Sequence, residues 1–424
     1  MIREDFLHYL WKHKLYDFSN LISSTDEKIE IINCGIHNLN SGPDFFNAQV
    51  KIDNQIWVGN VEIHVKASDW YVHNHEIDTA YDNVTLHVVW ENDMDIFRKD
   101  NTKITTLILK DYVSNELIVN YQKLFSKNQK WINCEKDINL IDKFTINNWL
   151  ERLYLERLND KSDFILNLLK QSNNDWEAVL FKLLAKNFGL KVNGDAFFQL
   201  ANSFDYAILR KNLSNIEKIE ALLFGQASLL SDDFEDAYHD DLIKEYSFLQ
   251  IKFKLKSIHK NEIKFFRLRP NNFPTIRISQ LANIYYQYQS LFSKIMAINN
   301  IDDFYNIFNI TTTKYWETHY SFKSSSSKRK KKLTKSFIDL LLINTIIPLK
   351  FVYLKHIGKL DEELILQLIQ QIKPEKNSII EKFNFLKIET KNALETQALL
   401  QLKNNYCNKN QCLQCAVGNK LLVN

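Results

Sequence analysis

The sequence predicts an α+β protein, in which an N-terminal mixed sheet with flanking helices precedes a large all-α domain. Short segments with alternating apolar residues fill residues 28–109, whereas helical periodicity dominates from Asp142 onward. The charge changes near the same place, because residues 1–115 contain 10 Lys and Arg against 18 Asp and Glu, a net charge of −8, and the other 309 residues carry +11. We therefore expect a sheet domain over residues 1–115, a linker over 116–141 and a helical domain over 142–424.

Five strands are predicted in the N-terminal part, because apolar and polar residues alternate there in runs rich in β-branched side chains. These strands are expected at residues 28–34, 45–53, 55–66, 83–91 and 103–109. Asp53-Asn54 lies between the second and third strands, as a hairpin turn would. Helical spacing of apolar residues predicts a helix over residues 4–15, and a short helix fits within residues 75–82.

The helical domain is predicted from amphipathic segments, two of which end at Gly. The expected helices lie over residues 147–170, 174–189, 215–225, 237–255, 279–297, 335–355, 361–372 and 391–402. Residues 267–277 hold two of the five prolines and three of the nine arginines, and we expect a structured connection there. The run SSSSKRKKK over residues 324–332 is expected to be a mobile surface loop.

The composition excludes several classes of protein. With 45% hydrophobic and 25% charged residues, and only 8 Gly and 5 Pro in 424 residues, the chain is neither collagen-like nor disordered throughout. Five cysteines are too few for a disulfide framework, and their odd number leaves at least one thiol unpaired. No apolar run approaches the roughly 18 residues that cross a bilayer, and the charged N-terminus has no signal-peptide core. We therefore expect a cytoplasmic protein without a membrane partner.

Residues able to bind a metal concentrate between residues 33 and 90. They are His37, His64, His73, His75, His87, Asp44, Glu62, Asp69, Asp78 and Asp82. Glu62, His64 and Lys66 alternate within one predicted strand, so their side chains share one face at a spacing of about 6.8 Å. The turn before the preceding strand can bring Asp44 beside Glu62. Two carboxylates on adjacent strands are the minimum protein contribution to a Mg²⁺ or Mn²⁺ site, and a nearby amine or imidazole can orient a water molecule.

Each of these residues also has a structural interpretation. Acids and histidines in a small acidic sheet domain are often solvated. His73 and His75 are expected in a surface loop, and His87 alternates with Val and Leu as a core histidine would. Glu4 could add a carboxylate, but an acid at a helix N-terminus is also favoured by the helix dipole.

GPDF followed by VEIHVK, within the order helix, three strands, helix and strand, resembles the core of the PD-(D/E)xK nuclease superfamily. Pro43, Asp44 and Glu62 match the superfamily motif, with the two acids 18 positions apart. The resemblance implies a restriction-nuclease-like sheet over roughly the first 95 residues, in which Asp44 and Glu62 bind a divalent cation. It also implies that the residue two positions after Glu62 assists the attacking water. His64 stands there in place of the usual lysine, and Lys66 follows two residues later.

Longer runs along the chain are similar to an uncharacterised bacterial family, domain-of-unknown-function family 2851. These runs are GPDFFNAQVKI, GNVEIHVKASDWYVH, YDNVTLHVVWE, IEALLFGQA, RLRPNNFPTIRISQLA and YCNKNQCLQCAVGNKLL. This resemblance implies no established activity.

A second candidate site lies at the C-terminus, where Cys407, Cys412 and Cys415 fall within nine residues. Such close spacing is typical of zinc or iron–sulfur ligation, since the ligands must converge on one atom or cluster. The leading candidate for the fourth ligand is Cys134, with Cys34 and a histidine behind it. The layout is similar to the iron–sulfur branch of the nuclease superfamily, but departs from it in spacing. Buried or redox-active free thiols are the alternative.

Two basic segments are candidate contacts for nucleic acid. Arg267, Arg269 and Arg277 can bind phosphate bidentately, or they can pair with acids of the N-terminal domain. The run at 324–332 can attract a polyanion, or it can be a solvated loop.

Two functions therefore stay open. The first is a metal-dependent nuclease, with Asp44 and Glu62 on the ion and His64 or Lys66 positioning the water, and the second is a non-catalytic nucleic-acid- or protein-binding scaffold with a nuclease-like fold.

Overall fold

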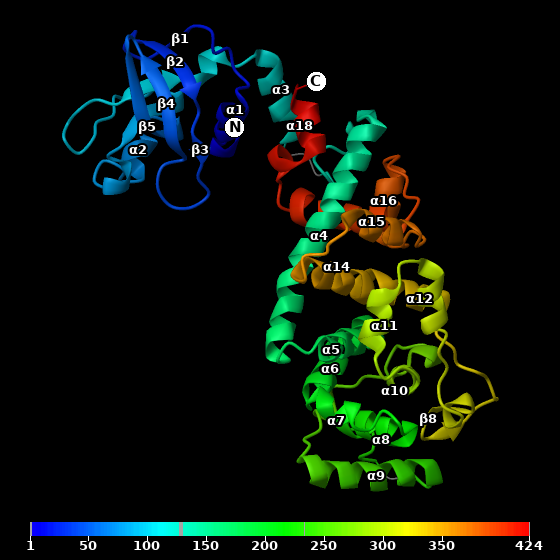
Figure 1. Cartoon of the computed structure of the whole chain (residues 1–424). Helices are drawn as coiled ribbons and strands as arrows, with labels where there is room; N and C mark the ends of the chain where they lie inside the picture. The colour runs from blue at the N-terminus through cyan, green and yellow to red at the C-terminus, as the bar shows by residue number, and fades with distance from the viewer. Residues whose placement is uncertain (1, 127–129, 233, 424) are drawn as a thin grey trace. The chain divides into compact units, whose positions relative to one another are not determined.

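The structure is a computed structural model that describes residues 2–126, 130–232 and 234–423 (Figure 1). The chain forms two compact units. The first comprises Met1–Trp149 together with Leu402–Asn424, and the second comprises Leu150–Gln401.

This division differs from the predicted domain ranges. The expected linker, residues 116–141, belongs to the same unit as the sheet, and the C-terminal segment with its three cysteines returns to that unit. The physical reason is packing: α18 (Ala416–Val423) packs against α3 (Asn115–Leu124), which lies within the expected linker.

The first unit is built on a seven-stranded mixed sheet, which confirms the predicted fold class. Its strands are β1 (Leu21–Ile22), β2 (Lys28–Asn33), β3 (Ile36–His37), β4 (Phe45–Ile52), β5 (Gln55–Lys66), β6 (Val84–Glu91) and β7 (Thr105–Ile108). The hydrogen-bonded order is β1-β2-β4-β5-β6-β7, and β3 also pairs with β4. The pairs from β1 to β5 are antiparallel, whereas β5–β6 and β6–β7 are parallel. All five predicted strands are present.

The register of β5 with its two neighbours positions the candidate site. Ile52 pairs with Gln55, so Asp53-Asn54 form the predicted hairpin turn, with a φ of 49° at Asp53. At the other end of the hairpin Phe45 pairs with Val61, which places Asp44 opposite Glu62. On the far side of β5, Glu62 lies opposite His87 of β6.

Several short helices belong to the same unit as the sheet. Besides α3 and α18 they include α1 (Glu4–His13), α2 (Asp69–Val72) and the 3₁₀ helix η1 (Thr79–Tyr81). α1 packs on β5, and its Phe6 and Leu10 side chains are fully buried. The helix expected within residues 75–82 is replaced by η1 alone, because the Asp78 carboxylate accepts a hydrogen bond from the amide of Ala80 and starts the helical turn only there.

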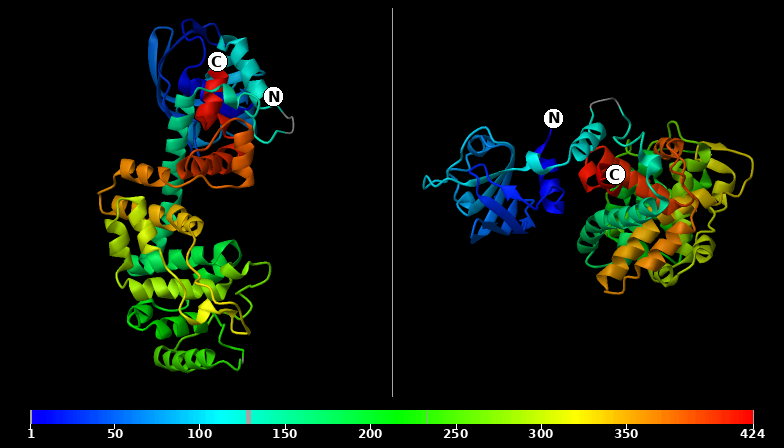
Figure 2. Two further views of the ribbon diagram at one scale, coloured as in Figure 1. Left: turned by 90° about the vertical axis from the view of Figure 1, so that its right-hand side faces the viewer. Right: turned by 90° about the horizontal axis from the view of Figure 1, so that it is seen from above.

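The second unit is helical, apart from a ribbon of β8 (His319–Ser321) and β9 (Ser324–Ser325) (Figures 1 and 2). Its helices are α5 (Trp176–Phe188), α6 (Leu190–Asn202), α7 (Tyr206–Arg210), α8 (Ile216–Gln226), α9 (Ala237–Phe253), α10 (Pro274–Gln287), α11 (Leu291–Ala297), α12 (Ile301–Ile307), α13 (Lys335–Leu341), α14 (Ile347–His356), α15 (Glu362–Gln370), α16 (Ser378–Phe385) and α17 (Ala393–Gln401). The helix α4 (Lys143–Gln171) contributes most of its length to this unit. Asp175 caps α5 and Asn215 caps α8, as side-chain acceptors for backbone amides.

Two predictions in the second unit are wrong in detail. The connection expected over 267–277 ends at Phe273, because Pro274 occupies the first helical position, where a missing N–H costs nothing. Arg277 therefore lies inside α10. The run 324–332 is not a surface loop throughout, since Ser324–Ser325 forms β9 and Lys331 is buried, with its ammonium donating to the carbonyls of Trp316 and Glu317.

One described helical segment, Lys335–His356, is long and apolar enough to cross a membrane by length and composition. Within the structure, 72% of its most apolar stretch is buried inside the protein. Such burial is typical of the core helix of a soluble protein.

Candidate metal centre

Asp44 and Glu62 meet at the end of the β4–β5 hairpin. The amide of Asp44 donates to Glu62 Oε2 at 3.1 Å, and the amide of Ile63 donates to Asp44 Oδ2 at 2.9 Å. The loop before Asp44 is held by Asn38, whose side-chain amide donates to several of its carbonyls, and it turns at Gly42 with a φ of 95°. The two carboxylates therefore come together as the strand register requires.

Glu62 is 5% exposed, and its environment disfavours the charged carboxylate. Burial, and secondarily the charge of Asp44, raise the pKa of Glu62 to about 9. A cation bound beside the two carboxylates would offset the electrostatic repulsion between Asp44 and Glu62.

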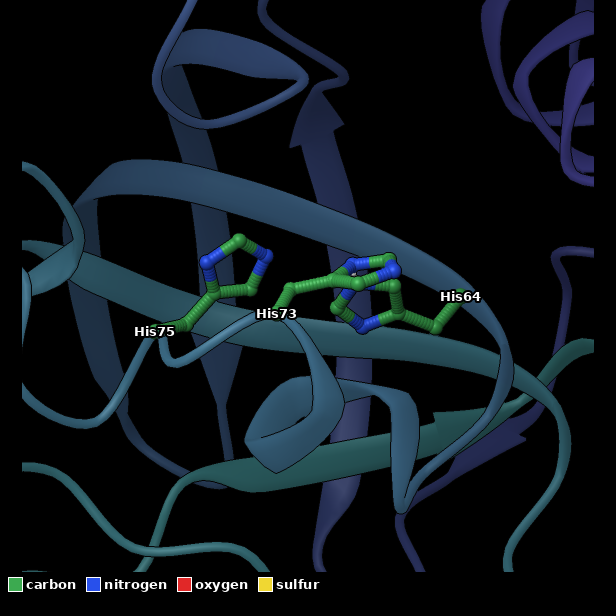
Figure 3. A group of neighbouring side chains, drawn as sticks. All are labelled: His64, His73 and His75. Atoms are coloured by element: carbon green, nitrogen blue, oxygen red, sulfur yellow. Dashed lines mark hydrogen bonds between the residues drawn. The ribbon is translucent and has the colours of Figure 1, made fainter.

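Three histidines lie close together, His64 on β5 and His73 and His75 in the turn after α2 (Figure 3). His64 Nε2 lies 3.5 Å from Glu62 Oε1, and His75 Nε2 lies 3.2 Å from the same oxygen. His64 Nε2 is also 3.1 Å from His73 Nδ1. One ring nitrogen from each of the three histidines lies within 4.8 Å of the others.

A fourth imidazole supports this group from β6. His87 is fully buried, and its Nε2 lies 2.8 Å from His64 Nδ1. Burial and neighbouring imidazoles lower the pKa of His64 to about 2 and that of His87 to about 3, so both rings are neutral.

The turn after α2 explains why His73 and His75 face the sheet. Asn74 has a φ of 60°, and the amide of His75 donates to the carbonyl of Trp70 at 3.0 Å, as in a Schellman motif. Tyr81 stacks on the His75 ring at a centroid distance of 3.7 Å. His75 is thus 9% exposed and not the surface-loop residue expected, whereas His73 is exposed.

His8 of α1 adds an imidazole on the Asp44 side. Its Nε2 lies 3.1 Å from Asp44 Oδ2 and 3.9 Å from Glu4 Oε1. Burial opposes protonation of His8, but the contact with Asp44 outweighs it and raises the pKa. The sequence signal for His8 was its position four residues after Glu4, which puts both side chains on one helical face.

Of the other predicted residues, only His37 touches this group: it stacks on Phe45 at 4.8 Å and makes an edge contact with His8, with ring centroids 5.6 Å apart. Lys66 ends β5 with an exposed side chain, and its amide donates to Asp69 Oδ2 at 2.9 Å. Asp78 serves as the cap of η1, and Asp82 follows that helix.

The four cysteines predicted to share a metal lie near one another in the first unit, although among the described residues only the three histidines have candidate ligand atoms all within 4.8 Å of one another. The side-chain amide of Asn133, next to Cys134, donates to Cys412 Sγ at 3.3 Å. Burial and the charges of Cys407, Cys415 and Cys412 all raise the pKa of Cys134. All five cysteines are free thiols, and the fifth, Cys34, directly follows β2.

The three arginines of residues 267–277 have different surroundings. Arg267 and Arg269 are exposed. Arg277 is 6% exposed, donates to Gln280 Oε1 at 2.9 Å and to Asn272 Oδ1 at 2.6 Å, and lies 3.7 Å from the ring centre of Phe337. The Arg277 guanidinium therefore makes its contacts with groups inside the protein.

The geometry defines a mixed α/β protein whose sheet carries a buried group of carboxylates and imidazoles. The profile of one family, described as a protein of unknown function (DUF2851), matches residues 4–378. The chain belongs to this family, as its sequence runs indicated. A search of curated proteins and a search of solved structures each gave no match.

Proposed function

We propose that the protein is a divalent-metal-dependent hydrolase that cleaves nucleic-acid phosphodiester bonds. The observation that carries the proposal is the convergence of Asp44 and Glu62 on adjacent strands, with His8 on one carboxylate and His64 and His75 on the other. Carboxylate oxygens are the ligands that Mg²⁺ and Mn²⁺ prefer. The raised pKa of Glu62 supports a cation site here, since a bound cation would stabilise the ionised Glu62 carboxylate that the protein alone disfavours.

In this mechanism Asp44 and Glu62 hold the cation, which when bound lowers the pKa of a water and polarises a phosphoryl oxygen. His64, while its Nε2 binds no metal ion, positions that water in place of the usual lysine, and Lys66 is the alternative at the solvent end of the same strand. His8 holds a proton at Nε2 beside Asp44, where it can protonate the leaving oxygen. The basic part of the chain, with exposed Arg267 and Arg269, attracts the phosphate backbone.

The experiment compares the wild type with Glu62→Gln and with a matched control, Glu91→Gln, which changes an exposed glutamate at the end of β6. We expect Mn²⁺ or Mg²⁺ to raise the melting temperature of the wild type and of the control, and to support cleavage of labelled DNA or RNA. Asp44→Ala and Glu62→Gln should lose both effects.

The second candidate is a non-catalytic scaffold that binds nucleic acid or protein. The specific observation in its favour is that His64 replaces the usual lysine while Lys66 is exposed. A wild type that binds nucleic acid but cleaves none, with or without divalent metal, would support this alternative.

We also propose that Cys134, Cys407, Cys412 and Cys415 hold zinc or an iron–sulfur cluster, because cysteines that lie near one another from two segments suit these metals. A cytoplasmic location agrees with this proposal, since the five free thiols persist in a reducing compartment.

A further inference from the structure

We infer that Glu62, His64, His73 and His75 form a binding site for a transition-metal ion of the zinc type, separate in ligand chemistry from the proposed Mg²⁺ or Mn²⁺ site. The inference does not depend on phosphodiester cleavage. It uses Glu62 Oε1, whereas the other oxygen of Glu62 faces Asp44.

Three of the six separations among the four candidate ligand atoms are close to those around a small ion, and one ring nitrogen from each histidine lies within 4.8 Å of the others. Tetrahedral zinc binds at about 2.0–2.1 Å, which sets neighbouring ligand atoms about 3.3–3.4 Å apart. His64 Nε2 lies 3.1 Å from His73 Nδ1 and 3.5 Å from Glu62 Oε1, and His75 Nε2 lies 3.2 Å from the same carboxylate oxygen.

Ordinary hydrogen bonding does not account for the contact of His75. Its Nε2 is buried 3.2 Å from the Glu62 carboxylate, yet it has no hydrogen-bond partner among the described residues. A buried ring nitrogen and a carboxylate oxygen that lie this close without bonding to each other fit a shared third partner between them.

The contact with His87 favours metal binding by His64. If His64 Nδ1 carries the proton and donates to His87 Nε2, His64 Nε2 presents a lone pair toward Glu62 and His73, which accepts from His73 Nδ1 or binds an ion. Metal-bound histidines are commonly fixed through their other nitrogen in this way. In that tautomer the fully buried His87 fixes His64 in the form that can bind a metal.

The ligand types decide the class of metal. Three imidazoles and one carboxylate select zinc, cobalt and related ions over Mg²⁺ and Ca²⁺, which prefer all-oxygen sites. His73 is the exposed member of the group, so an ion can enter from its side.

The test titrates the full-length, chelator-treated protein with Co²⁺, whose absorption reports its ligands. We expect visible bands of a nitrogen–oxygen site, competition by Zn²⁺ and none by Mg²⁺. His73→Ala and His75→Ala should each weaken this binding by at least about tenfold, whereas the control His13→Ala, at the exposed end of α1, should not. Because His73 is exposed, His73→Ala keeps the test valid even if His75→Ala does not fold.

Cobalt bound to cysteines is recognised by an additional thiolate charge-transfer band, which Cys412→Ser should remove without affecting the nitrogen–oxygen bands. If all binding disappears in Cys412→Ser and persists in His73→Ala, the inference is wrong. Cobalt binding at the histidines without cleavage of any nucleic acid would overturn the proposed function alone.

Discussion

At the scale of single residues, the most unusual feature is a pair of neutral imidazoles in the interior. His64 Nδ1 lies 2.8 Å from His87 Nε2. Burial, and secondarily the charge of neighbouring imidazoles, lowers the pKa of His64 to about 2 and that of His87 to about 3. In the unfolded chain a histidine has a pKa of about 6.5. Below that pH the two histidines bind protons in the unfolded state but not in the folded state. The free energy of unfolding therefore decreases as the pH falls below about 6.5.

Because of these two histidines, we expect the free energy of unfolding to fall at acid pH, and we expect His87→Gln to reduce this dependence. Each of the two histidines should lower the free energy of unfolding by up to about 1.4 kcal/mol per pH unit as the pH falls from about 6.5 toward 3. His87→Gln removes one titrating group, so its stability should depend less on pH than that of the wild type. Urea unfolding of the chelator-treated proteins between pH 6.5 and 4.5 measures the difference, and parallel curves would contradict the assignment.

At the scale of elements, the turn after α2 determines whether the histidines meet. Asn74 is exposed and adopts a left-handed conformation, with His73 before it and His75 after it. Asn and Gly tolerate this conformation, whereas a β-branched residue is strained in it by about 1–2 kcal/mol.

We therefore expect Asn74→Val to destabilise the turn and to weaken Zn²⁺ binding, with little effect on the sheet. Asn74→Gly is the matched control and should bind Zn²⁺ like the wild type, since glycine adopts the same conformation without strain. Calorimetric titration with Zn²⁺ and circular dichroism test both variants. Equal Zn²⁺ affinity in Asn74→Val would show that the turn does not position the ligands.

The elements also show what could be predicted from the sequence. Strand β5 has the predicted bounds, because its alternation and the hairpin turn at Asp53 are local signals. The adjacency of Asp44 and Glu62 follows from that register. The approach of His73 and His75 was missed because it depends on the left-handed Asn74 and on burial against Tyr81, which alternation does not encode. The buried position of Arg277 does not follow from the sequence pattern, because a proline can end a helix or start one, and Pro274 starts α10.

At the scale of the whole molecule, charge is separated along the chain, with −8 in residues 1–115 and +11 in the rest. If the basic part holds nucleic acid, affinity should fall steeply with salt, because each phosphate contact releases counterions. Arg267→Ala with Arg269→Ala should weaken binding and reduce the salt slope by about 1–2, without loss of stability. Arg277→Ala should instead lower stability by about 2–4 kcal/mol, because it removes buried hydrogen bonds and packing. Unchanged binding in the stable double variant would remove these arginines from the nucleic-acid interface.

The division into two units has a consequence for metal-dependent stability. The C-terminal segment belongs to the first unit, where α18 packs against α3, and that segment carries Cys407, Cys412 and Cys415. Ligation energy in a thiolate site contributes to folding. Metal removal should therefore act on the first unit and leave the second, Leu150–Gln401, as it was.

Calorimetry of the anaerobically purified full chain should show two unfolding transitions, only one of which shifts when a chelator is added. A loss of about 5 kcal/mol corresponds to a fall of about 10–20 °C for a unit of this size. Cys412→Ser should reproduce the shift and release zinc or iron, whereas Cys34→Ser, at the end of β2, should do neither. Cys412 belongs to the proposed metal-binding group and Cys34 does not. If the two variants show the same unfolding temperature and metal content, the four thiols hold no metal.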